Sequence, residues 1–211
     1  MPSATHLPAA RLDTWGENGS QLPSEPMIAA LRNRNYDEFA QLLEEKSDEN
    51  NVVSEEVTAE VSAALQSLRA AVYGARGAIG SSSTIKSIIK CMNVFSSRID
   101  IVGQGLNILY YLVDHPPNCQ QALDNGIVPV IILAMKTFVD DKKIQSNACG
   151  IIWVIAKDMK VRVEKGEIDE VISLIKKATE LQHFQNLEIG QRNPYRFKIV
   201  VPGRALHRLE E

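Results

Sequence analysis

The sequence predicts an all-α protein, a short right-handed α-solenoid of stacked helical units with extended segments at both termini. Three observations favour this fold class. Apolar residues recur at intervals of three and four over most of the chain, which is the spacing of one helix face. Pro and Gly separate these runs into segments of helix length. A group of apolar residues also recurs at a fixed distance along the chain, which is typical of helical repeats.

Composition indicates a folded protein without a strong overall charge. Of the 211 residues, 45% are hydrophobic and 23% are charged, which is ordinary for a globular protein. The 23 basic and 26 acidic residues give a net charge of -3, so no general attraction to nucleic acid or anionic lipid is expected. No apolar run approaches the roughly 18 residues of a membrane helix, and the first residues lack the pattern of a secretion signal. We therefore expect a cytoplasmic protein that does not insert into a membrane.

The residue types that usually carry catalysis or bind metals are scattered. Three widely spaced cysteines, Cys91, Cys119 and Cys149, argue against a disulfide framework or a zinc site. Cys91 and Cys149 fall within apolar helical patterns, where cysteine is usually a small buried hydrophobic residue. The four histidines have no metal-ligand spacing. We expect no enzymatic activity, no cofactor and no metal.

Residues 1–25 are rich in Pro, Gly, Ser and Asn and predict a flexible N-terminal segment. Trp15 is the exception within it. A single aromatic residue in a polar segment is either incidental or an anchor that inserts into a pocket on a partner protein. Both interpretations stay open at this stage.

Residues 26–73 predict a cap or degenerate repeat. The apolar spacing indicates two short helices with a break between Asn33 and Asn35. Ser54, followed by two glutamates, has the pattern of an N-cap with an acidic first turn. The helix that it opens should end near Gly74.

The clearer repeats lie in residues 84–182. The glycine-rich stretch 73–84 lacks the preceding strand and the Gly-Lys-Ser/Thr of a phosphate-binding loop, so we interpret it as a connection. Beyond it, apolar spacing predicts a series of helices that contain residues 85–95, 101–112, 127–139, 144–156 and 171–175.

The repeat has an offset of 43 residues. Four apolar residues recur identically at this offset: Ile88, Ile89, Met92 and Phe95 correspond to Ile131, Ile132, Met135 and Phe138. An aromatic residue recurs in the next helix, as Tyr110 and Trp153, and an offset of 40 relates Gly126 to Gly166. One such unit cannot bury its own apolar helix, so neighbouring units stack. Both glycines predict tight turns with a positive φ before a helix.

The segment 122–158 resembles an armadillo repeat in its order of features. It has a glycine turn followed by apolar residues and proline, an apolar helix, a short loop and a helix that begins Gln-x-x-Ala. Armadillo repeats differ from HEAT repeats in having a separate short first helix. Residues 118–123 and 159–165 suit such a helix and therefore favour the armadillo type. The resemblance implies a solenoid whose third helices line a concave groove that binds proteins.

The resemblance places residues 101–113 and 144–156 on that groove. The asparagine and tryptophan by which related grooves clamp an extended peptide are absent, because Val154 and Gly150 stand at those positions. In the preceding repeat these positions hold Tyr111 and Asn107. We therefore do not expect peptide clamping of that kind.

The same helices carry a row of aromatic residues, Tyr110, Tyr111 and Trp153. Four amides flank the row: Gln104, Asn107, Gln145 and Asn147. Aromatic residues beside amides are common in protein interfaces, which predicts a partner-binding site. The alternative is that the aromatic rings pack between repeats and only their polar ends reach the surface.

Residues 183–211 predict an extended basic C-terminal tail. Pro194 ends the helical pattern, and residues 195–201 alternate as in a strand or an extended arm. Five basic residues lie between positions 192 and 208, with no acidic residue among them: Arg192, Arg196, Lys198, Arg204 and Arg208. They suit contacts with an acidic protein or with RNA.

These patterns predict a non-catalytic protein-interaction module, either an adaptor or scaffold or a structural subunit of a multi-subunit complex. It would contact other proteins through its third helices and its tails. The alternative is a nucleic-acid-associated helical-repeat protein that uses the basic C-terminal arm. The small number of charges and the absence of a recognised nucleic-acid motif favour the protein partner.

Overall fold

The computed structural model describes residues 23–47, 54–74, 82–180 and 202–210. Within them it has ten helices and no strand, which confirms the all-α prediction. The helices are α1 (Glu25–Arg32), α2 (Tyr36–Lys46), α3 (Glu55–Gly74), α4 (Ser82–Val94), α5 (Ile99–Val113), α6 (Pro116–Asp124), α7 (Ile127–Thr137), α8 (Lys142–Arg162), α9 (Lys165–Thr179) and α11 (Pro202–Glu210). No helix in these described ranges is both long enough and apolar enough to cross a membrane.

The structure confirms the break, the N-cap and the helix end that the sequence predicts in residues 26–74. Asn35 caps α2 by accepting a hydrogen bond from the Glu38 amide at 3.3 Å, so the break between α1 and α2 is confirmed. Ser54 caps α3, because its hydroxyl accepts a hydrogen bond from the Val57 amide at 3.2 Å. The helix ends at Gly74, as expected.

One of the two predicted glycine turns is present. Gly126 has a φ of +76°, the left-handed conformation that suits glycine, and it joins α6 to α7. The prediction for Gly166 is wrong, since this residue lies in the first turn of α9. The short helix predicted over 159–165 is also not separate, because α8 continues to Arg162. Met159 is fully buried, and this apolar contact extends the helix beyond the predicted end at Ala156.

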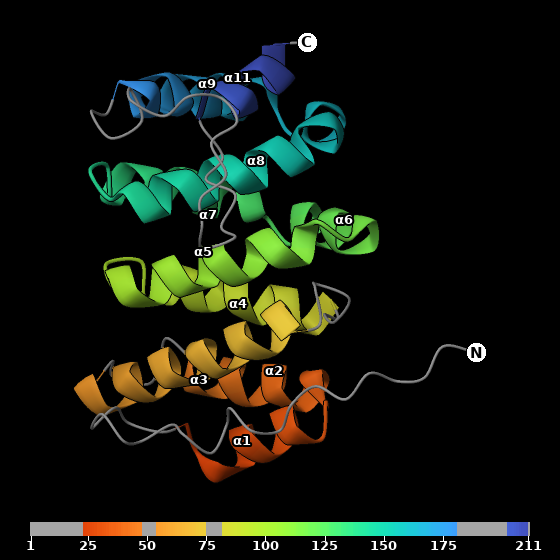
Figure 1. Ribbon diagram of the computed structural model, residues 1–211, viewed down its shortest axis with the longest axis vertical. Coiled ribbons are helices and arrows are strands. Elements are labelled where there is room, and N and C mark those ends of the chain that lie inside the picture. Colours follow the sequence, from red (N-terminus) through yellow and green to blue (C-terminus); the bar gives the residue numbers. More distant parts are fainter. Residues whose placement is uncertain (1–22, 48–53, 75–81, 181–201, 211) are drawn as a thin grey trace.

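The helices stack in chain order along the long axis of the molecule (Figure 1), with α1 at one end and α11 at the other. Two rows run along this axis. In one row α3 packs on α5, α5 on α8 and α8 on α11; in the other α2 packs on α4, α4 on α7 and α7 on α9. The apolar side chains between the rows form a single core cluster that extends from Met27 to Leu209.

The C-terminal segment differs from the prediction of an extended tail. Residues 202–210 form α11, which packs against both α8 and α9. Pro202, Ala205 and Leu209 are buried, and their spacing of three and four residues places them on one helix face. The sequence prediction failed here because a nine-residue amphipathic helix is stable only when its apolar face is packed. Arg192, Arg196, Lys198 and residues 195–201 lie outside the described residues, as does Trp15.

Candidate functional site

A cluster of three tyrosines joins α3 to α5. The rings of Tyr73 and Tyr111 meet edge to face, with 5.7 Å between centroids and an interplanar angle of 87°. The ring centroids of Tyr110 and Tyr111 also lie 5.7 Å apart. Burial raises the pKa of Tyr110 and of Tyr111, so both hydroxyls stay neutral at physiological pH and can donate or accept hydrogen bonds. We call Tyr73, Tyr110 and Tyr111 the tyrosine cluster.

Tyr73 is the member that the sequence prediction missed. Its side chain is 50% exposed, which makes it one of the most exposed large hydrophobic residues of the described structure. It lies at the end of α3, a helix that belongs to the predicted cap and not to the aligned repeats. Its spacing from Tyr110 is 37 residues, not 43, so the repeat offset could not find it.

Tyr110 has a packing role as well. A Cβ atom added at Gly150 would lie 2.8 Å from Cε2 of the Tyr110 ring, so this ring covers the glycine closely. Gly150 lies in α8, and the contact therefore brings α5 and α8 together. The Tyr110 ring therefore packs between α5 and α8. Tyr111 and Tyr73 lie beside it, towards α3.

Trp153 is separate from the tyrosine cluster. Among the described residues, no ring contact joins it to a tyrosine. Its indole is half-buried and lies under the Arg208 guanidinium of α11, 5.5 Å from the ring centroid. The predicted row of three aromatic residues is therefore divided into two places, one at the α3–α5 junction and one where α8 meets α11.

The four predicted amides have different roles. Gln145 is buried, and its amide nitrogen donates to the carbonyl oxygens of Met135 at 2.9 Å and Phe138 at 3.0 Å. It therefore stabilises the end of α7 and is turned away from the surface. Asn147 is half-buried in α8.

Gln104 and Asn107 lie on the stripe of α5 that carries Tyr111. Gln104 donates to the Ser62 hydroxyl of α3 at 3.0 Å. The remaining side-chain oxygens of Gln104 and Asn107 are buried without a hydrogen-bond partner, and Asn107 is only 8% exposed. Unpaired buried oxygens are rare in proteins and usually need an explanation. Here they lie one helical turn apart, beside the tyrosine cluster.

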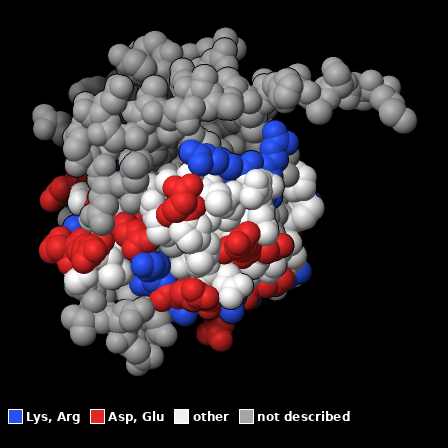
Figure 2. Space-filling view, turned by 90° about the horizontal axis from the view of Figure 1, so that it is seen from below, with Lys and Arg blue, Asp and Glu red and all other residues white. Residues whose placement is uncertain are grey.

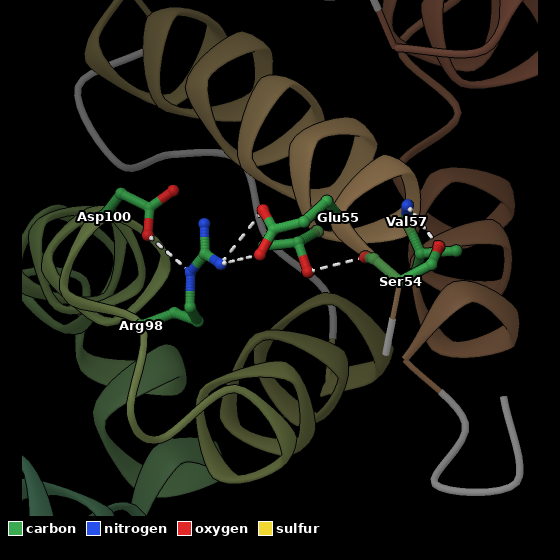
Figure 3. A network of polar contacts seen from close by, with 6 residues as sticks. Ser54, Glu55, Val57, Arg98 and Asp100 are labelled. Carbon is green, nitrogen blue, oxygen red and sulfur yellow. Dashed lines mark hydrogen bonds and ion pairs between the residues drawn. The ribbon is translucent and has the colours of Figure 1, made fainter. Parts of the chain in front are cut away.

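An ion-pair network joins the N-terminal ends of α3 and α5, which lie far from the tyrosine cluster (Figure 3). The Arg98 guanidinium lies between Glu55, at 3.1 Å, and Asp100, at 3.6 Å. Arg98 directly precedes α5, and Glu55 is the first residue of α3. Glu55 is 87% exposed, so this network contributes little to stability. The bond between Gln104 and Ser62 and the edge-to-face contact of Tyr73 with Tyr111 also join the two helices. The α3–α5 junction therefore presents its tyrosines in a defined arrangement.

The N-terminal end of the stack is acidic (Figure 2). Helices α1 to α3 carry eight acidic and three basic side chains, and acidic groups cover several parts of the face seen from below. This end adjoins the tyrosine cluster through α3. A cationic partner would therefore be attracted to this end and a nucleic acid repelled from it.

The cysteines lie in surroundings that disfavour the thiolate. Burial raises the pKa of Cys91 and of Cys149 to about 12, and burial together with Asp158 raises that of Cys119 to about 11. All three thiols are therefore neutral near pH 7 and poor nucleophiles. In the described part of the chain, no three His, Cys, Asp or Glu side chains form a group that could hold a metal ion.

Comparison of the chain with family models, curated proteins and solved structures finds no match. Function must therefore be argued from the arrangement of the helices and from the surfaces they present.

Proposed function

We propose that this chain is an armadillo-like helical-repeat protein that binds other proteins without catalysis, as an adaptor or as a structural subunit of a larger assembly. The binding surface that we propose is the tyrosine cluster with the adjoining faces of α3 and α5. The order of α6, α7 and α8, a short helix followed by two longer ones, supports the repeat type. The glycine turn before α7 and the stacking of equivalent helices in rows support it too.

The observation that carries the proposal is the contact between the exposed Tyr73 and the half-buried Tyr111. Tyrosine is enriched at interface hot spots because its large ring gains contact area while few side-chain torsions are immobilised. The pair is held by an edge-to-face contact, and the Gln104–Ser62 hydrogen bond joins the same two helices. A preordered aromatic surface of this kind loses little entropy when a partner binds.

The unpaired oxygens of Gln104 and Asn107 support the same surface. A buried acceptor without a donor costs free energy in the unbound protein. A partner that approaches α5 beside Tyr111 and supplies N–H groups would relieve this cost after a small side-chain movement. Binding there would combine aromatic contact with hydrogen bonding.

The test is co-purification of the tagged full-length chain from its native source, with the stoichiometry of bound proteins measured. We expect the double substitution Tyr73→Ser and Tyr111→Ser to remove the stoichiometric partners while the helical content stays unchanged. Leu133→Ser is the matched control, because Leu133 is 41% exposed but lies on α7, in the other row. Equal loss of partners in the control, or retention of all partners in the double variant, would contradict the proposal.

A further inference from the structure

The border between α3 and α5 carries a positive charge beside its tyrosines. Two contacts join the helices along this border: Gln104 donates a hydrogen bond to Ser62, and Tyr73 meets Tyr111 edge to face. Arg69 lies on α3 between these contacts, seven residues after Ser62 and four before Tyr73, which is the spacing of one helix face. Arg69 is exposed, as Tyr73 is. It therefore stands one helical turn from the tyrosine pair.

Arg69 has no ion-pair or hydrogen-bond partner among the residues that the structure describes. By contrast, Arg32 and Lys46, the other basic side chains of helices α1 to α3, each pair with a glutamate. Burial and the neighbouring Tyr73 raise the pKa of the Tyr111 hydroxyl, and the Arg69 charge opposes them. The guanidinium is thus near enough to act on Tyr111, and its charge is available to an anion that contacts this ring.

The acidic groups of α3 lie too far along the helix to cancel this charge. All three of its glutamates are in the first two turns, and the last of them, Glu60, precedes Arg69 by nine residues. At the rise of an α-helix this is about 13 Å, which exceeds the Debye length of about 8 Å at physiological ionic strength. The carboxylate of Asp114 acts on Tyr110, whereas Arg69 acts on Tyr111. The acidic character of the N-terminal end therefore does not extend to the surface around Arg69.

We propose that the tyrosine cluster and Arg69 together bind an acidic peptide segment of a partner protein. In this segment an Asp or Glu carboxylate pairs with Arg69, and a neighbouring apolar side chain packs on Tyr73 and Tyr111. A guanidinium suits a carboxylate because its N–H groups can donate two parallel hydrogen bonds to the two oxygens. This assignment rests on the function proposed above, because it names the chemistry of the partner for the same surface.

The amides of α5 suit the backbone of the same segment. Gln104 and Asn107 each have a buried side-chain oxygen without a hydrogen-bond partner. Backbone N–H groups on either side of the carboxylate would supply the missing donors after a small side-chain movement. An exposed ion pair contributes little affinity, so Arg69 would decide which segment binds while the tyrosine rings supply most of the contact energy.

The experiment begins with a library of random short peptides displayed on phage and the immobilised full-length chain as the target. Phage that bind the chain with Tyr73→Ser and Tyr111→Ser are removed first, so the peptides that remain depend on the tyrosine pair. We expect these peptides to carry Asp or Glu beside an aromatic or aliphatic residue and to be poor in Lys and Arg. The same selection with an Arg69→Glu chain should enrich Lys and Arg instead, because the charge beside the tyrosines is then reversed.

The dissociation constant of one selected peptide then tests the ion pair itself. Arg69→Gln should weaken its binding about two- to fivefold, as expected for the loss of an exposed ion pair. A version of the peptide with Asn or Gln in place of its acidic residue should bind the Arg69→Gln chain and the unsubstituted chain equally. The matched control is Arg204→Gln, which removes an exposed arginine of α11 at the other end of the stack. Its affinity for the peptide should equal that of the unsubstituted chain.

The possible failures separate this assignment from the function on which it rests. Tyrosine-dependent peptides without acidic residues, or with Lys and Arg in their place, would overturn the acidic partner and leave the protein-binding surface standing. So would equal weakening by Arg69→Gln and Arg204→Gln. If no selected peptide depends on the tyrosine pair, both the acidic partner and the tyrosine cluster as a binding surface are wrong.

Discussion

The two flanks of α8 carry two different aromatic contacts with neighbouring helices. On one flank, Tyr110 of α5 lies against Gly150 so closely that no additional carbon fits. On the other flank, Trp153 is half-buried, as Tyr110 is, and the Arg208 guanidinium of the nine-residue α11 lies over its ring. The ring of one helix therefore lies on the next helix in both places, once against a glycine and once beneath an arginine.

The largest difference in reactivity between the folded and the unfolded chain is expected for Cys149, a fully buried thiol of α8. With a pKa of about 12, about one in ten thousand of these thiols is ionised at pH 8 in the folded protein. We expect a thiol reagent to modify Cys149 roughly a thousandfold or more slowly in the folded than in the unfolded chain. Rapid modification at pH 8, detected by mass spectrometry, would show that the folded protein does not bury this thiol.

The same thiol contributes a pH dependence with a defined sign. Burial raises its pKa above the value of about 8.5 in the unfolded chain, because the folded protein favours the neutral thiol. The stability from this group is therefore fully present below about pH 8.5 and is lost as the pH rises towards 12. Cys149→Ala should make the decrease of unfolding free energy over this range less steep, as measured with urea.

Another prediction compares two helical glycines. Gly150→Ala places a carbon 2.8 Å from the Tyr110 ring, whereas the nearest atom to a Cβ at Gly103 lies 4.0 Å away. Both substitutions gain helix propensity, but only the first overpacks a neighbour. We expect Gly150→Ala to be about 1–3 kcal/mol less stable than Gly103→Ala in urea unfolding. The penalty should disappear when Tyr110→Ala is added, and its persistence would show that the Tyr110 ring is not its cause.

A further prediction concerns the flank of α8 that α11 covers. Amide hydrogen exchange in α11 should proceed by local release of this helix, while α5 and α8 exchange by wider unfolding. Leu209→Ala removes the largest buried side chain of α11, so we expect exchange in α11 to become on the order of tenfold faster. Exchange in α5 should not change. Parallel acceleration in both helices would mean that α11 is an integral part of the core.

The smallest expected effect is that of Lys176→Ala. It removes an exposed ion pair with Glu210, which contributes about 0–1 kcal/mol and less at high salt. Exchange in α11 should therefore accelerate slightly at low salt and not at all in about 1 M salt. A large effect that persists in high salt would show that this pair, and not the apolar face, holds α11.

Much of the helical framework could be predicted from local signals. Ser54 and Gly126 mark a helix start and a helix turn through chemistry that depends on adjacent residues only. Gly166 shows the limit of this reasoning. Its offset of 40 residues from Gly126 suggested a turn, but Glu164 caps a helix that already begins at Lys165. A glycine permits a positive φ but does not require it.

The candidate sites were harder to predict because they depend on which helix faces which. Gln145 and Asn147 are both amides of α8, yet only the first points inward to the end of α7. The docking of α11 depends on contacts across a long sequence separation, and no spacing in the chain encodes them. Tyr73 could not be predicted as a member of the tyrosine cluster for the same reason, because its partner Tyr111 lies on another helix.

Site-specific photo-crosslinking of the full-length chain in its native source tests the central claim of protein binding most directly. A photoreactive phenylalanine would replace Tyr73 on the α3–α5 junction or, as the control, Leu133 on α7. Both side chains are exposed to a similar extent. We predict a discrete crosslink to another protein from position 73 and none from position 133. Crosslinks from position 133 only, or from neither position, would contradict this claim.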